Sequence, residues 1–271
     1  SPRIRKGLNR AGTGNISVMG SKRNKLADRA VCLLVRTFSR IVSLIPRPVA
    51  YFLCETIASL VYLLDRKHRK IGMINLGIAF PAASQRWRRR ILHQSFRQLG
   101  THAVEMCRLH RMPPDELIRR VSYDQSFEYY LKAREENKGL IFLTAHLGCW
   151  ELISTTHSAN GYRLNVLVRP LDNPCLDQWM SEGRSRFGTG IIQKTNALRQ
   201  MLSLLKDKQE IGILLDQNVQ EKDGVYAPLF GRPASTSVGL AAIVMKTGCP
   251  VIAAFIMPGP RKGTFVINMS P

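Results

Sequence analysis

Acidic residues and aromatic residues are scarce in this sequence: 19 Asp and Glu stand against 40 Lys and Arg, and aromatics make up only 7%. No uninterrupted apolar run reaches the roughly 20 residues that span a bilayer, and the first 25 residues lack the apolar core of a signal peptide. The six cysteines form no C-x-x-C pair, and no histidines stand at zinc-finger spacing. This pattern predicts a reduced, cytoplasm-facing protein without a structural metal.

The positive charge is concentrated in the N-terminal part of the chain. Residues 1–120 carry +18 of the formal net charge of +21, and residues 121–271 carry only +3. Such an imbalance predicts contact with an anionic partner. The basic run at 86–90 is accompanied by no helix-turn-helix, ribonucleoprotein or zinc-finger motif, which argues against nucleic acid and favours lipid headgroups.

A basic amphipathic helix is predicted over residues 26–45. Arg29, Arg36 and Arg40 fall on a narrow stripe of this helix, and the remaining surface is mostly Leu, Val, Ile and Phe. We expect the stripe to face anionic lipid.

A second helix is predicted over residues 49–64, whose only charged residue is Glu55. Because 16 residues fall short of a span, residues 26–70 are predicted to form an interfacial or partly inserted helical hairpin, preceded by a disordered basic tail over residues 1–25. The alternative is a pair of soluble core helices with a solvated basic face.

From residue 139 onward, short β-rich runs alternate with amphipathic segments. This alternation predicts an α/β fold, a mixed sheet flanked by helices, within a domain over residues 71–271 that follows the basic, membrane-associated helical region. The expected strands are 140–145, 164–168, 211–215, 251–257 and 264–267, and the expected helices are 150–160, 174–186, 195–208 and 235–247.

The strongest candidate site follows the first of these strands. His146 and Glu151 are five residues apart, and Gly148 permits the turn that they need in order to meet. A neutral imidazole can remove a proton from a hydroxyl, and a carboxylate on its other nitrogen fixes the tautomer. We therefore predict His146 as a general base and Glu151 as its orienting partner.

Cys149 offers a rival chemistry as a thiolate nucleophile. Its neighbours Leu147 and Trp150 predict an apolar environment, in which cysteine behaves as a small hydrophobe. The other histidines stand on basic or helical segments without an acidic partner at useful spacing, so no metal site is predicted.

Two further groups of residues are candidates for a substrate site. Arg169 follows the strand at 164–168, and Asp216 follows the strand at 211–215, at the edge where sites collect in α/β folds. One group supplies arginines suited to oxyanions, and the other ends the strand at 211–215 and is also explained as a simple turn. The first group comprises Arg169, Arg186 and Gly188, and the second Asp216, Gln217 and Asn218.

Several blocks in a fixed order resemble the bacterial lipid A late acyltransferases, the lauroyl and myristoyl transferases of lipopolysaccharide assembly, which are related to phosphatidylinositol mannoside acyltransferases. The matching blocks cover most of the chain. They are DRKHRKIGMINLGIAFP (65–81), SFRQLGTHAVEM (95–106), H-x4-E (146–151), RPLDNP (169–174), RFG (186–188), DQN (216–218) and PLFGRPAST (228–236). Family members usually continue with an acidic, Trp-containing segment, whereas this sequence ends at Pro271.

The resemblance implies a glycerolphosphate-acyltransferase-like fold and transfer of a fatty acyl chain to a hydroxyl of a glycolipid, at the cytoplasmic face of the bacterial inner membrane. Acyl carrier protein, which is acidic, or coenzyme A would supply the acyl thioester as co-substrate, without a cofactor. Another lipid acceptor, such as a phospholipid or ornithine lipid, and a catalytically silent membrane-binding relative stay open as alternatives.

Overall fold

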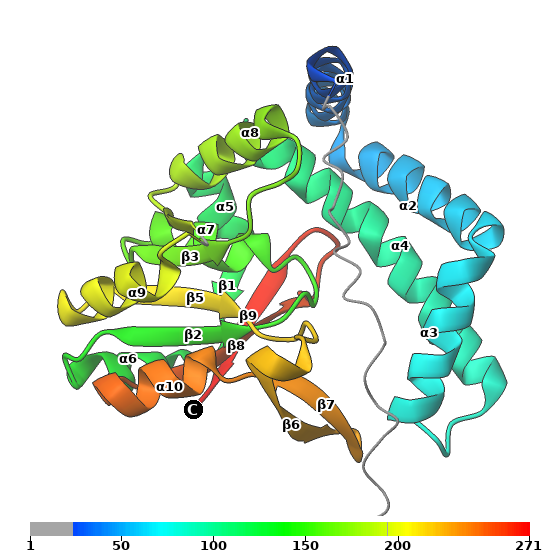
Figure 1. Ribbon diagram of the computed structural model, residues 1–271. Helices are drawn as coiled ribbons and strands as arrows, with labels where there is room; N and C mark the ends of the chain where they lie inside the picture. Colours follow the sequence, from blue (N-terminus) through cyan, green and yellow to red (C-terminus); the bar gives the residue numbers. More distant parts are fainter. Residues whose placement is uncertain (1–23, 194) are drawn as a thin grey trace, which may run out of the picture.

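Seven strands form the central sheet of the computed structural model, which describes residues 24–193 and 195–271 (Figure 1). Their order is β1-β9-β8-β2-β5-β3-β4; β9 runs antiparallel to β8, and the other neighbouring pairs are parallel. The predicted mixed α/β sheet is confirmed. The strands are β1 (Val121–Tyr123), β2 (Leu140–Thr144), β3 (Leu164–Val168), β4 (Gly190–Gln193), β5 (Glu210–Leu214), β8 (Val251–Pro258) and β9 (Phe265–Ser270).

Helices cover both faces of this sheet. Along β2, Leu140 and Phe142 join the apolar cluster beneath α5, α6 and α7, whereas Ile141 joins the cluster beneath α9 and α10, as the two-residue period of a strand requires. The four helices predicted after residue 139 are confirmed as α7 to α10. The bounds are α5 (Pro114–Arg120), α6 (Phe127–Glu135), α7 (Glu151–Ala159), α8 (Pro174–Ser185), α9 (Ala197–Lys206) and α10 (Gly239–Thr247).

Sequence periodicity did not indicate two short edge strands, β1 and β4, or the separate β6–β7 hairpin. The two edge strands have three and four residues, too few for a period to show. In the hairpin, β6 (Gly224–Leu229) pairs antiparallel with β7 (Arg232–Ser237), and a short 3-10 helix, η1 (Glu221–Asp223), precedes it.

The N-terminal region is helical: α1 (Lys25–Leu44), α2 (Arg47–Leu64), α3 (Arg66–Ala79) and α4 (Gln85–Leu109). Asn24 caps α1, since its side-chain oxygen accepts the N–H groups of Leu26 and Ala27. Helix therefore begins at the end of the predicted basic tail, and residues 1–23 lie outside the described residues.

Both α1 and α2 pack against α4, and Figure 1 views α1 almost along its axis but α2 from the side. The approach of α2 to α4 is closest at Gly100. A Cβ atom at Gly100 would lie 2.6 Å from the backbone carbonyl carbon of Cys54, so only glycine permits this crossing.

Glu105 of α4 connects the N-terminal helices to α5 and, through Arg120, to the loop between β8 and β9. Its buried carboxylate accepts hydrogen bonds from Arg47 at 3.1 Å, from Arg120 at 3.0 Å and from Tyr51. Arg120 also donates to the carbonyl of Gly263 in the loop between β8 and β9. A buried carboxylate requires such partners, and these come from α2 and α5.

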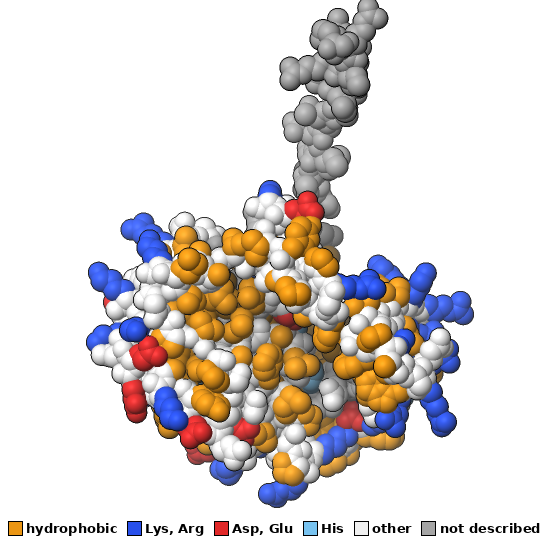
Figure 2. All heavy atoms as spheres, turned by 90° about the horizontal axis from the view of Figure 1, so that it is seen from below, with side chains coloured by type: hydrophobic (Ala, Val, Ile, Leu, Met, Phe, Trp, Pro, Cys, Tyr) orange, Lys and Arg blue, Asp and Glu red, His pale blue; other side chains and the backbone are white. Residues whose placement is uncertain are grey.

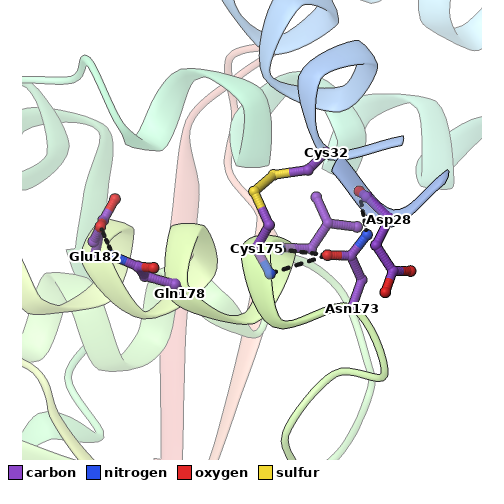
Figure 3. The surroundings of a disulfide bond; sticks show 7 residues. Asp28, Cys32, Asn173, Cys175, Gln178 and Glu182 are labelled. Carbon is purple, nitrogen blue, oxygen red and sulfur yellow. Dashed lines mark hydrogen bonds between the residues drawn. A yellow bond between two sulfur atoms is a disulfide. The ribbon is translucent and has the colours of Figure 1, made fainter. Parts of the chain in front are cut away.

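The prediction that the cysteines are reduced is wrong for one pair. Cys32 of α1 and Cys175 of α8 form a disulfide across 143 residues, with the Cα atoms 6.0 Å apart (Figure 3). Beside it, the side chain of Asn173 caps α8 and donates to the carbonyl of Asp28 at 2.8 Å. Spacing could not indicate this pair, because only the fold brings α1 to α8; the other four cysteines are free and buried.

Two other histidines have acidic partners, contrary to expectation. In the first turn of α3, His68 Nδ1 lies 2.6 Å from Oδ2 of Asp65. His157 is buried, and its Nε2 lies 3.0 Å from Glu210, whose other oxygen accepts from Tyr130 at 2.8 Å. The second partnership was missed because Glu210 comes from a strand that lies beside α7 only in the folded chain.

Candidate active site

His146 and Asp216 meet where two neighbouring parallel strands end. Thr144, the last residue of β2, is in register with Leu214, the last residue of β5. The second residue after each strand, His146 or Asp216, is polar and lies at the carboxyl edge where sites of α/β sheets form. His146 Nδ1 lies 2.8 Å from Asp216 Oδ1, and the backbone N–H of His146 donates to Oδ2 at 3.0 Å.

These two contacts fix the state of both side chains. Burial alone would raise the pKa of the Asp216 carboxyl, but the hydrogen bonds from the His146 side chain and backbone outweigh it, and the pKa is lowered. An ionised Asp216 accepts, so Nδ1 carries the proton and Nε2 of a neutral ring is the basic nitrogen. The side chains are 38% and 37% exposed, within reach of a substrate.

Glu151 is not the partner of His146. Its carboxylate accepts two hydrogen bonds from the Arg184 guanidinium, from Nε at 2.8 Å and from Nη2 at 2.6 Å. Glu151 begins α7 and Arg184 lies in the last turn of α8, so the pair joins these helices. Burial would lower the pKa of Arg184, but the hydrogen bond and charge of the Glu151 carboxylate outweigh it, and the pKa of the guanidinium is raised.

The turn between His146 and Glu151 depends on Gly148. Its φ is +63°, and a Cβ atom there would lie 2.5 Å from the Ile256 carbonyl oxygen. After the turn, the Trp150 ring packs edge-on against the His146 ring, with centroids 5.0 Å apart. Cys149 is buried, and burial raises the pKa of its thiol, which argues against the thiolate nucleophile.

A narrow apolar pocket of about 40 Å³ opens beside the Glu151–Arg184 pair. It lies between α7 and the face of the sheet, and residues of β2, β3 and β5 line it. Its walls include Phe142, Trp150, Val166, Val168 and Leu214. An ionic pair at the rim of a hydrocarbon-lined space is suited to an amphipathic ligand.

The other predicted residues are only partly brought together. Gln217 and Asn218 are exposed and directly follow Asp216, and Arg169 is exposed just beyond the end of β3, at the same edge of the sheet. Arg186 lies over the Phe187 ring, 5.9 Å from its centroid, and the arginine that reaches Glu151 is instead Arg184.

Gly188 lies outside this group. The nearest atom to a Cβ built there is Cβ of Ser158, 3.8 Å away, near the end of α7 opposite to Glu151. Ser158 is seven positions after Glu151 on α7, so the two residues are about 10 Å apart along the helix axis.

The sequence profile described as "Bacterial lipid A biosynthesis acyltransferase" matches residues 19–271. The chain belongs to this acyltransferase family. It is 24% identical over 229 residues to the lipid A biosynthesis lauroyltransferase of Escherichia coli (strain K12), covering 84% of this chain and 74% of that protein. The lipid A biosynthesis palmitoleoyltransferase of the same strain is 25% identical over 186 residues, which are 69% of this chain and 60% of that protein.

The myristoyltransferase of that strain is 20% identical over 208 residues, which are 77% of this chain and 64% of that protein. These relatives differ in the acyl chain that their names specify. The resemblance to this acyltransferase family, drawn from the motifs, is thus confirmed.

Proposed function

We propose that this protein transfers a fatty acyl chain from an acyl thioester to a hydroxyl of a lipid A precursor or a related glycolipid. The observation that carries the proposal is the Asp216–His146 pair, in which Nδ1 is held by a carboxylate and Nε2 is the basic nitrogen. A thioester is already activated, so one base and a group of oxyanion donors suffice without a covalent intermediate.

His146 acts as the general base in this proposal. Nε2 takes the proton of the acceptor hydroxyl as its oxygen bonds to the thioester carbonyl carbon. When the resulting oxyanion collapses, the carbon–sulfur bond breaks, and the imidazolium returns the proton to the leaving thiolate. The products are an ester and a free thiol. The proposed oxyanion donors are backbone N–H groups near Gly148 and the side-chain amides of Gln217 and Asn218.

Asp216 takes the orienting role that spacing had given to Glu151. Glu151 acts through Arg184: the two parallel hydrogen bonds fix the guanidinium at the rim of the apolar pocket, where the acyl chain would enter. Arg169, at the same edge of the sheet, would contact an anionic part of a substrate.

An anionic membrane surface is the proposed location, at the cytoplasmic face of the bacterial inner membrane. Apolar side chains on α1 and α2 that no other part of the described chain covers support it, and α2 is the one described helix long and apolar enough to cross a membrane. Figure 2 shows hydrophobic side chains gathered over the middle of one face, with Lys and Arg around its edges. The uncovered residues include Leu26, Leu33, Leu34, Leu44, Phe52, Leu63 and Leu64.

The acyl donor in this proposal is acyl carrier protein or coenzyme A, since the formal net charge of +18 on residues 1–120 favours an acidic carrier or an anionic nucleotide. The glycerolphosphate-acyltransferase-like fold assignment stays a prediction.

Mass spectrometry tests the proposal. The protein and its His146→Ala variant are incubated with acyl carrier protein or coenzyme A thioesters and a total membrane lipid extract. The expected result is a new acylated glycolipid, with a rate reduced by about 10²–10⁴-fold in the variant. Near-normal turnover by His146→Ala would exclude His146 as the general base. An acylated lipid of another class would overturn the proposal that the acceptor is a glycolipid.

A further inference from the structure

A second cavity, of about 180 Å³, lies between α4 and the loop that joins β8 to β9. Its volume is far above the roughly 10–15 Å³ that holds one water molecule. Gly148 and Cys149 form one wall, so the cavity lies directly behind the turn that carries His146. Ile256, Pro258 and Phe265 make its other walls largely apolar.

Cationic and neutral polar side chains line the rest of this cavity. Arg261 and Lys262 come from the β8–β9 loop, and Gln98 and Thr101 come from α4. None of the described residues that line the cavity is an Asp or a Glu. Lys262 pairs with Glu55 at 2.6 Å, whereas Arg261 pairs with no carboxylate in the described part of the chain. Arg261 is therefore available to an anionic ligand.

His102 supplies a second, independent observation. Its Nδ1 is a buried polar atom that has no hydrogen-bond partner among the described residues, which is uncommon in folded proteins. The His102 ring also lies edge-on to Trp150, with centroids 6.4 Å apart, and so contacts the turn that carries His146. His102 also lines the cavity, so its ring borders the space that a ligand would occupy.

We propose that this cavity binds a phosphate ester, with the phosphate between Arg261 and Lys262 and the attached group against the apolar wall behind Gly148. The fork of an Arg guanidinium beside a Lys ammonium suits a tetrahedral oxyanion. The inference rests on the proposed function, whose two substrates offer two sources of such a group. One is the phosphopantetheine arm of the thioester carrier, and the other is a phosphate on the glycolipid.

Isothermal titration calorimetry of the full chain in nonionic detergent micelles tests the site without any acyl transfer. The probes are inorganic phosphate, phosphopantetheine and glucose 1-phosphate. The double variant Arg261→Gln/Lys262→Gln is expected to weaken phosphate binding by about tenfold or more. The matched control Lys206→Gln/Lys246→Gln, which removes two exposed charges elsewhere, is expected to change it by less than about twofold.

Arg261→Gln alone is the second variant, because it leaves the Lys262–Glu55 ion pair intact and is expected to preserve the thermal unfolding transition while still weakening binding. Tighter binding of phosphopantetheine assigns the site to the donor, and tighter binding of glucose 1-phosphate assigns it to the acceptor. No binding of any probe, or an equal loss in the control, overturns the proposal. Phosphate binding through Arg261 by a protein that transfers no acyl chain would contradict the proposed function and leave this site standing.

Discussion

Asp216 accepts hydrogen bonds from both the side chain and the backbone N–H of His146, a residue 70 positions earlier in the chain. Two contacts from one carboxylate fix the position of the loop as well as the tautomer of the ring. The base of the proposed reaction therefore depends on the pairing of β2 with β5.

Replacing Asp216 by Asn tests this dependence. The substitution keeps the shape of the side chain, but its amide cannot hold the Nδ1 proton as a carboxylate does, so the productive tautomer of His146 is lost. We expect kcat to fall by about 10²-fold or more with KM nearly unchanged, measured in the acyl-transfer assay. Asp207→Asn, on the surface at the end of α9, is the matched control. Equal rates for the two variants would contradict an orienting role for Asp216.

Glu151 and Arg184 should behave as one unit in stability measurements. Arg184→Met leaves a carboxylate, 14% exposed, without its partner, and we expect a loss of roughly 3–5 kcal/mol in the free energy of unfolding. Glu151→Gln should destabilise for the same reason, and the double variant should lose less than the sum of the two. Urea unfolding of the four proteins completes the cycle.

The control for this cycle is Glu182→Gln, on the same helix as Arg184. In the part of the chain that the structure describes, its carboxylate accepts a single, exposed hydrogen bond, from Gln178 at 3.0 Å, so its effect should lie within about 0.5 kcal/mol. Strictly additive effects of Glu151→Gln and Arg184→Met would mean that the two side chains are not energetically coupled.

The Cys32–Cys175 disulfide predicts a thiol count. Four thiols should react with a thiol reagent in denaturant, and six should react after reduction. Because the bond closes a loop across 143 residues, its reduction should cost roughly 4–5 kcal/mol of stability on the chain-entropy account. A reductant should lower the melting temperature of the parent protein, but not that of Cys32→Ser/Cys175→Ser. Six reactive thiols before reduction would show that the two cysteines are not bonded.

The stripe of Arg29, Arg36 and Arg40 is exposed on α1, as the helical spacing predicts. Replacing all three by Gln should weaken binding to anionic vesicles by about 1 kcal/mol for each charge near the surface and should flatten the salt dependence. Co-sedimentation with vesicles at several salt concentrations measures both effects.

A matched triple variant removes three exposed cations from the α/β body and should leave vesicle binding nearly unchanged. If both triple variants weaken binding equally, the contact depends on net charge and not on α1. The control positions are Lys132, Lys206 and Lys246.

Local sequence patterns were sufficient to predict the helices and strands that bury one apolar face. The helices from α7 to α10 and five strands of the central sheet follow from periodicity, and the strand-end position of His146 follows from the apolar run before it. Helical spacing puts Leu99 of α4 on the same face as the buried Leu92, yet Leu99 is 56% exposed. The crossing of α2 at Gly100 buries a neighbouring face, which a helical period alone does not specify.

The sequence by itself determined most of the helices, five strands of the central sheet, the excess of positive charge and the turn at Gly148, because each depends on local patterns along the chain. Only the tertiary structure decided which carboxylate meets which base. His146 pairs with Asp216 because the order of strands in the sheet places the end of β5 beside the end of β2. Glu151 pairs with Arg184 because the fold brings the start of α7 to the last turn of α8. The same holds for Cys32 and Cys175: partners that are distant in sequence are set by packing, which no local spacing records.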